Sequence, residues 1–191
     1  MKKYIEITLL PDVDTDIHTL WAKIFGWVHV SIVEIKNHHG GHNIAVSFPE
    51  YNDDTKELGS KLRVFSDDEE TLKMFTVCIR LSRLPDHAHS TSIKNVPSDV
   101  STFVCFKKSQ PKANKHKRAR RLAKRSNITF KEALAKYDDY QDKTTNLPYI
   151  NTVSSQKLRF PMFISMTTMD CYEKGDFNSY GLSASGMVPT F

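Results

Sequence analysis

The sequence is poor in cysteine and contains no long apolar run. Its three cysteines are widely spaced and form no CxxC pair, which argues against a disulfide framework and fits a reducing cytosol. No stretch of about 18 apolar residues is present, so we expect no membrane-spanning helix. The apolar stretch near the N-terminus is soon broken by Pro11 and Asp12, which argues against a signal peptide. Together these absences predict a cytoplasmic protein.

Motifs for nucleotides and metal ions are also missing. No glycine-rich loop of the kind that cradles phosphate is present, so nucleotide hydrolysis is not supported. Asp12, Asp14 and Asp16 begin like a calcium loop, but Ile17 and Lys23 occupy the positions that require glycine and glutamate. Two groups of histidines lack the further ligands of a zinc site and are interpreted as solvated loop residues: His38, His39 and His42, and His87 and His89. We therefore expect neither a metal ion nor a cofactor.

Acidic residues are absent from residues 107–125, although this segment contains ten of the 27 lysines and arginines. The rest of the chain has 17 basic and 22 acidic residues, so the net charge of +5 is concentrated on one element. Such focused positive charge favours phosphate binding, because each neutralised phosphate releases condensed counterions. The segment therefore predicts a nucleic-acid-binding element on an acidic body.

The basic segment is predicted to be helical, since residues 112–125 contain good helix formers and neither glycine nor proline. At 100° per residue the cations gather on one wide face: Lys117, Arg120, Arg121 and Lys124, flanked by Arg118 and Arg125. The opposite face is narrow and apolar: Ala119, Leu122 and Ala123. Asn127 is placed to end this helix, and Thr129 with Glu132 forms the pattern of a capping box for the next one.

Other roles for such a helix are less well supported. A merely solvated helix is disfavoured, because like charges three and four residues apart destabilise it and no acids compensate. The apolar face is too small for good membrane insertion. The major groove of B-form DNA accepts a helix, whereas regular A-form RNA narrows that groove, so an RNA target would be a hairpin with an accessible end. Charge alone leaves DNA and RNA both open.

The segments before residue 97 predict a ferredoxin-like domain, because their order is strand, helix, strand, strand, helix, strand. These segments are residues 4–10, 17–34, 43–48, 61–65, 67–74 and 89–93. Residues 96–99 (VPSD) form a natural boundary, which gives domains at 1–96 and 97–191. The second domain would hold the basic helix, a further helix, and strands at 147–153, 158–166 and 180–188. The expected fold class is α+β, which by itself decides no function.

Several segments, taken in order along nearly the whole chain, resemble one family. They are the opening strand, residues 24–29 (IFGWVH), 44–49 (IAVSFP) and 58–63 (LGSKLR), the basic helix, residues 147–149 (LPY), and the ending at 180–183 (YGLS) and 188–191 (VPTF). Together they are similar to the CRISPR repeat-processing endoribonuclease of type I-F systems. The resemblance implies a ferredoxin-like domain followed by a domain with an arginine-rich helix. It also implies an enzyme that cuts repeat RNA at the base of a hairpin, stays bound to the mature guide RNA and joins other subunits of a surveillance complex.

The resemblance assigns RNA-binding residues. The family's helix enters the major groove of the hairpin and contacts phosphates, which implies this role for Lys117, Arg120, Arg121, Lys124 and Arg125. A neighbouring arginine and glutamine read bases in the family; Gln110 matches the glutamine, whereas Lys108 stands at the arginine position. Lysine cannot present the planar fork of arginine, so we expect weaker base reading at Lys108, or a share taken by Lys107. Phe160 matches an aromatic residue that stacks on the terminal base pair, and a core role beside Phe163 is the alternative.

Catalytic residues follow from the same resemblance. Cleavage without a metal ion uses the RNA's own 2′-hydroxyl as nucleophile and leaves a 2′,3′-cyclic phosphate. A histidine, with an ordinary pKa of about 6.5, is suited to take the proton of that hydroxyl. His29 matches the catalytic histidine through the pattern FGxxH in residues 25–29. Ser154 matches a serine that positions the attacking ribose, with Ser155 as the alternative, and Tyr180 matches a tyrosine that orients the histidine.

Two functions without catalysis stay open from the residues alone. A non-catalytic subunit of a ribonucleoprotein complex would bind the RNA hairpin through the same basic face but release no product. A DNA-binding regulator would bind duplex DNA at least as tightly as the RNA hairpin when the salt concentration is matched.

Overall fold

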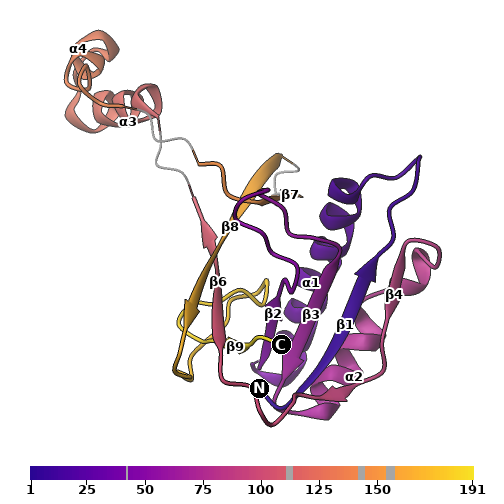
Figure 1. Ribbon diagram of the computed structural model, residues 1–191. Coiled ribbons are helices and arrows are strands. Elements are labelled where there is room, and N and C mark those ends of the chain that lie inside the picture. The colour runs from indigo at the N-terminus through magenta and orange to yellow at the C-terminus, as the bar shows by residue number, and fades with distance from the viewer. Residues whose placement is uncertain (42, 111–113, 142–144, 154–157) are drawn as a thin grey trace. The chain divides into compact units, whose positions relative to one another are not determined.

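The structure is a computed structural model that describes residues 1–41, 43–110, 114–141, 145–153 and 158–191. The chain forms two compact units (Figure 1). The first combines Met1–Ser109 with Leu147–Phe191, and the second is Gln110–Asn146. Among the described residues the first unit contains two antiparallel sheets, two α-helices and a short 3-10 helix, and the second contains two α-helices.

The first sheet belongs to the N-terminal half of the chain. Its strands follow the order β2-β3-β1-β4, with every neighbouring pair antiparallel, and β5 also pairs with β1. The elements of this half are β1 (Lys3–Leu9), α1 (Ile17–His39), β2 (Ile44–Ser47), β3 (Lys61–Ser66), α2 (Glu69–Cys78), a 3-10 helix (Leu81–Arg83), β4 (Ala88–Ser90) and β5 (Lys94–Asn95). Strand, helix, strand, strand, helix, strand is the order expected of a ferredoxin-like domain.

The second sheet is built from the C-terminal half and is also antiparallel, in the order β7-β8-β6-β9. Its strands are β6 (Phe103–Ser109), β7 (Tyr149–Val153), β8 (Arg159–Met169) and β9 (Val188–Pro189). Two antiparallel sheets with separate helices confirm the predicted α+β class.

Side chains from both sheets form one buried core. Strand β1 alternates, with Ile5, Ile7 and Leu9 inward. Helix α1 adds a stripe of eight buried residues, and the second sheet contributes Phe106 and Ile164 to the same cluster. The predicted boundary at residue 96 separates the two sheets in the sequence, but the core crosses it. The division into a ferredoxin-like domain at 1–96 and an RNA-binding domain at 97–191 stays a prediction.

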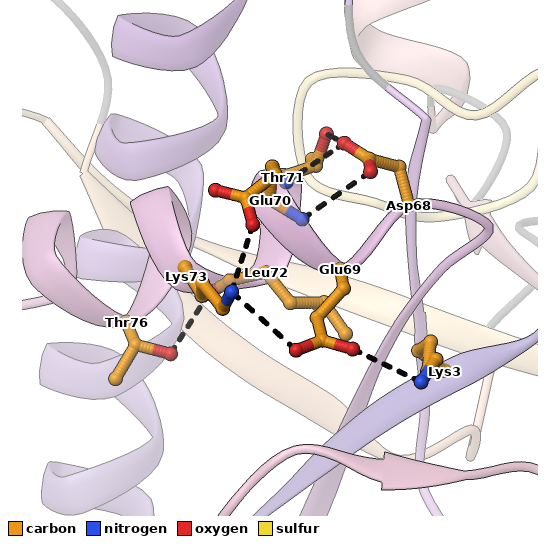
Figure 2. A network of polar contacts seen from close by, with 8 residues as sticks. All are labelled: Lys3, Asp68, Glu69, Glu70, Thr71, Leu72, Lys73 and Thr76. Carbon is orange, nitrogen blue, oxygen red and sulfur yellow. Dashed lines mark hydrogen bonds and ion pairs between the residues drawn. The ribbon is translucent and has the colours of Figure 1, made fainter.

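The N-terminus of α2 is fixed by side chains that the sequence places there (Figure 2). Asp68 is the cap: its carboxylate accepts hydrogen bonds from the backbone N–H and the hydroxyl of Thr71, which lower its pKa. Lys73 lies 2.7 Å from Glu70 and 3.5 Å from Glu69, and Lys3 of β1 lies 3.0 Å from Glu69. The negative charges in the first turn therefore interact favourably with the helix dipole. Through Lys3, Glu69 also links the helix to strand β1.

The second unit contains α3 (Lys115–Ser126) and α4 (Phe130–Ala135). Asn114 caps the start of α3. Asn127 ends the helix, as the sequence predicted, and adopts the left-handed conformation. The capping box of Thr129 and Glu132 is also present, with both reciprocal hydrogen bonds.

Three predictions about elements need correction. The basic segment is not helical from residue 107, because Lys107 and Lys108 belong to β6, which pairs with β8. The expected strand at 180–188 is wrong except at its end, where Val188–Pro189 pairs with β6. Ser183 forms an isolated bridge with Phe177, and the carbonyl of Asp176 accepts the N–H groups of residues 184–186. Helix α1 continues to His39, five residues past the predicted end, and stops at Gly40 with φ of 71°.

Candidate active site and basic helix

His29 lies on α1 where the buried stripe meets the solvent-exposed face. Phe25, Val28 and Ile32 around it are fully buried, whereas the His29 side chain is half-buried. Its Nδ1 lies 2.8 Å from the backbone carbonyl oxygen of Ser179. A carbonyl oxygen only accepts hydrogen bonds, so Nδ1 carries the proton in this contact. The neutral ring therefore keeps its lone pair on Nε2, which can accept a proton from a substrate.

Tyr180 covers one face of the His29 ring. The two ring centroids are 4.0 Å apart and the planes differ by 10°. Tyr180 also stacks with Phe25, at 5.7 Å and 18°. Burial raises the pKa of the Tyr180 hydroxyl, so this group is neutral at physiological pH and is not a base. The structure thus brings His29 and Tyr180 together, and the stacked tyrosine restricts the plane of the imidazole.

Backbone hydrogen bonds hold the segment that carries Ser179 and Tyr180. The side-chain oxygen of Asn178 accepts from the N–H of Tyr180, and its carbonyl accepts from the N–H of Gly181, both at 2.8 Å. The carbonyl of Gly181 accepts from the N–H of Val46 at 2.9 Å, which joins the segment to the outer edge of the first sheet. The main chain therefore fixes the carbonyl that orients His29.

Gly181 cannot be replaced without cost, because its φ is +72° and a Cβ would lie 2.7 Å from the Cγ1 atom of Val46. We expect Gly181→Ala to lower the free energy of unfolding by more than about 2 kcal/mol, measured by urea denaturation. Gly40→Ala is the matched control: φ is +71°, but no described atom lies within 4 Å of its added Cβ. Equal decreases in the two variants would show that the close approach to Val46 contributes nothing.

Phe160 and Lys108 meet at one end of the second sheet. Phe160 lies on β8, opposite Thr152 of β7, and is half-buried. The ammonium of Lys108 lies 5.6 Å from the centroid of the Phe160 ring, within the range of a cation–π contact. Phe160 shares a face of β8 with the buried Met162 and Ile164, but it lies where the core ends. An aromatic ring and a cation are therefore presented together at this edge.

The cations of α3 lie on the exposed face of the helix, as the sequence predicted. The five residues expected to contact phosphate are all exposed: Lys117, Arg120, Arg121, Lys124 and Arg125. None of the five forms an ion pair with a carboxylate of the described residues. On the other face Ala119 is fully buried and Leu122 is half-buried. The helix therefore presents concentrated, uncompensated charge, which favours a polyanionic ligand.

Arg118 differs from the other cations of α3. Its guanidinium lies 4.5 Å from the ring centroid of Tyr140 and 5.6 Å from that of Tyr137. Its Nη1 also donates a hydrogen bond to the Tyr140 hydroxyl at 3.1 Å. Arg118 thus packs α3 against the segment that follows α4. Its contacts stabilise the second unit, and its charge is not exposed like that of the five cations expected to contact phosphate.

Two further site residues were expected from the sequence, Ser154 and Gln110. Ser154 and its alternative Ser155 lie outside the described residues, so the position of the serine stays a prediction. Gln110 is exposed and begins the second unit, directly after β6.

Comparison with known proteins decides the family. A family model described as CRISPR-associated protein (Cas_Csy4) matches residues 4–191. The chain belongs to this family. The resemblance to type I-F repeat-processing enzymes drawn from the sequence is therefore confirmed.

Curated relatives agree with membership of the Cas_Csy4 family. The chain is 30% identical over 194 residues to the CRISPR-associated endonuclease Cas6/Csy4 of Pseudomonas aeruginosa (strain UCBPP-PA14), with 100% of both chains covered. It is 29% identical to the protein of the same name from Escherichia coli (strain UTI89 / UPEC), again with 100% of both covered. A solved structure of a CRISPR associated protein Cas6 covers 100% of this chain and 99% of its own at 10% identity, but its TM-score of 0.39 is too low to carry an argument.

Two functional features of this Cas_Csy4 family member were missed from its sequence. The Ser179 carbonyl, which sets the proton on His29, is a backbone atom 150 residues away and leaves no side-chain signal. Arg118 was placed beside the cationic face, yet the structure uses it in packing. The nearby pair Tyr137 and Tyr140 was the available signal, since arginine stacks readily on aromatic rings.

The acidic motif of this Cas_Csy4 chain serves local structure. Asp12 accepts hydrogen bonds from the backbone of Asp14 and Thr15, and Asp16 caps α1. In the described parts of the chain, no three histidines, cysteines or carboxylates are grouped closely enough to hold a metal ion. The described helices also include none that is long and apolar enough to cross a membrane.

Proposed function

We propose that this chain is an endoribonuclease that cuts CRISPR repeat RNA at the base of a hairpin, without a metal ion. The observation that carries the proposal is the geometry of His29, whose proton is fixed on Nδ1 by the Ser179 carbonyl. Among the described residues none is hydrogen-bonded to Nε2, which is therefore available to a substrate. Two relatives that match over their whole length are named endonucleases, which supports nuclease activity here.

The proposed nucleophile is the 2′-hydroxyl of the nucleotide on the 5′ side of the cut. Nε2 of His29 takes its proton while the 2′-oxygen attacks phosphorus. The bond from phosphorus to the 5′-oxygen breaks, and that oxygen takes up a proton from water. The products are a 2′,3′-cyclic phosphate and a 5′-hydroxyl. Ser154 would position the attacking ribose, and Tyr180 would hold the imidazole plane.

Binding of the hairpin is assigned mainly to α3. Its five exposed cations would contact phosphates in the major groove, and their number supports a product that stays bound as mature guide RNA. Gln110 and Lys108 would read bases near the cut, and Phe160 would stack on the terminal base pair. Lys108 already lies over the Phe160 ring, so we propose that it contributes charge at the stacking platform more than base recognition. Other subunits of a type I-F surveillance complex are the proposed protein partners.

A substrate with one altered sugar tests the mechanism. We expect a hairpin RNA with a single 2′-deoxy nucleotide at the cut to bind normally and to stay intact, because the nucleophile is missing. The same substitution one nucleotide further into the stem should leave cleavage unchanged, and the unmodified RNA should be cut equally well in excess chelator. Products are followed on denaturing gels, and a 2′,3′-cyclic phosphate is identified by mass spectrometry.

The outcomes separate the alternatives. Loss of cutting in chelator would overturn metal-independent cleavage. Stable hairpin binding without any product, even from unmodified repeat RNA, would instead identify a non-catalytic binding subunit.

A further inference from the structure

The face of α1 that carries His29 continues toward the N-terminus of the helix. At 100° per residue, His18, Ala22, Gly26 and His29 fall within about 80° of one another. Ala22 and Gly26 have the smallest possible side chains. Between His18 and His29 this face of the described helix therefore carries only alanine and glycine, which leaves a narrow path along it.

Gly26 lies in the interior of the helix, where glycine costs about 0.5–1 kcal/mol relative to alanine. Packing against the described residues does not account for it, because a Cβ at this position would meet none of their atoms within 4 Å. By contrast, Gly181 and Gly186 each have close neighbours that exclude a Cβ. A bare helix surface one turn before a candidate catalytic base indicates space needed for something that approaches closely.

The path ends in a cavity of about 500 Å³ between α1 and the hairpin of β7 and β8. Lys23 lines it from the helix, and Arg159 and Asn151 line it from the strands. Neither Lys23 nor Arg159 forms an ion pair with a described carboxylate. Asp16 also lines the cavity, but its carboxylate accepts hydrogen bonds from the N–H and hydroxyl of Thr19, at 2.9 and 2.8 Å. The cavity lining thus offers two cations that pair with no described carboxylate, an amide, and one carboxylate that is hydrogen-bonded to Thr19.

We propose that this surface, formed by Ala22, Lys23, Gly26, Asn151 and Arg159 and called here the α1 groove, binds the single-stranded RNA on the 3′ side of the cut. The inference rests on the proposed function and takes the stem to lie on the 5′ side of the scissile phosphate, so that the bound product keeps the hairpin. The strand that leaves the cut must then pass a surface next to His29. Lys23 is six residues from His29, about 9 Å along the helix axis, so the groove meets the first nucleotides beyond the cut.

Each part of the groove has a separate role. Gly26 lets the sugar–phosphate backbone approach the helix, which a methyl group would prevent. Lys23 and Arg159 approach the strand from opposite walls and neutralise phosphates. The amide of Asn151 can hydrogen-bond a base or a 2′-hydroxyl. Recognition by charge and backbone shape would require no particular sequence in this strand.

The experiment compares two RNAs with the same hairpin. One ends a single nucleotide beyond the cut and the other extends five nucleotides further. Affinities are measured with 2′-deoxy versions at several salt concentrations, and single-turnover rates with unmodified RNA. We expect the wild-type protein to bind the longer RNA about tenfold more tightly, with a salt slope steeper by about 0.7 for each phosphate that the groove neutralises.

Variants assign the effect to the groove. Lys23→Ala with Arg159→Ala should remove most of the advantage of the longer RNA, whereas Lys36→Ala, an exposed cation elsewhere on α1, should retain it. Gly26→Ala should raise the melting temperature, because alanine is the better helix former, and yet slow cleavage of the longer RNA at least fivefold. A lower melting temperature for Gly26→Ala would show that the position is packed and would overturn its role.

Different experimental results would contradict the α1 groove and the proposed nuclease function. If wild-type protein cuts both RNAs but gains nothing from the longer one, or if the double variant keeps that gain, the groove is not a binding site for the strand. If neither RNA is cut, the proposed nuclease function itself is wrong.

Discussion

His29→Ala is expected to slow cleavage of the repeat hairpin by about 10²- to 10⁴-fold, the contribution typical of a positioned general base. The dissociation constant for the hairpin should change less than about twofold, because phosphate binding is assigned to a different element. The reason is structural: the Ser179 carbonyl holds the proton on Nδ1, so the lone pair on Nε2 faces no competing partner among the described residues. Single-turnover cleavage and filter binding of the same RNA measure the two quantities.

His38→Ala provides the matched control, since His38 is an exposed histidine near the C-terminal end of the same helix. It should cut at the wild-type rate. Tyr180→Phe keeps the stacked ring and removes only the hydroxyl, so it should retain most activity if the ring acts by restricting the imidazole plane. Normal cutting by His29→Ala would show that another group takes the proton.

Local signals predicted the C-terminal end of α3 and the start of α4, but not the C-terminal end of α1. Asp68 before two glutamates, Asn127 after the basic run, and Thr129 with Glu132 each satisfy backbone groups within four residues of themselves. Such hydrogen bonds depend only on nearby residues, so the sequence shows them directly. The βαββαβ order followed from the same kind of reading, since each strand of the first sheet is bounded by proline, glycine or acidic residues.

The wrong predictions of secondary structure fall where contacts within the folded chain decide the conformation. Lys107 and Lys108 look like the start of a basic helix, but their partners are Ser165 and Ile164 on β8, more than 50 residues away. Residues 180–188 look like a strand, but residues 184–186 instead donate hydrogen bonds to the carbonyl of Asp176, which precedes them in a nearby loop. Gly175 and Gly186 pack so closely that a Cβ on either would lie within 3 Å of the other's backbone. Contacts of this kind depend on the folded topology and leave no local pattern.

In the candidate site, too, local features could be predicted from the sequence, whereas long-range contacts could not. A lone half-buried histidine on a helix carries little information in a sequence, and only resemblance to a family selected His29. What the structure adds is its environment: a carbonyl that fixes the tautomer and a ring that restricts its plane. The cationic face of α3 could be predicted from helical periodicity alone, because exposure of that face follows from the burial of Ala119 opposite.

Replacing Arg120, Arg121 and Lys124 by glutamine should weaken binding of the repeat hairpin by about 10²-fold or more at physiological salt. The slope of log affinity against log salt should fall by about 0.9 for each phosphate that the variant no longer neutralises. Glutamine is a good helix former and removes repulsion between like charges, so α3 should remain folded and circular dichroism should be unchanged. Arg118 is left in place, because its contacts with Tyr137 and Tyr140 stabilise the unit.

A control with the same reduction in net charge separates focused charge from total charge. Lys2, Lys36 and Lys94 are exposed and lie on the first unit, so their joint replacement by glutamine should change affinity only a few-fold. Each protein is measured against the RNA hairpin and against a DNA duplex of equal length at matched salt. If the two triple variants weakened hairpin binding equally, the face of α3 would be no more than part of a basic surface. If wild-type protein bound the DNA duplex as tightly as the hairpin, the RNA specificity assigned to this helix would be wrong, because the shape of a hairpin with an accessible major groove would then contribute nothing.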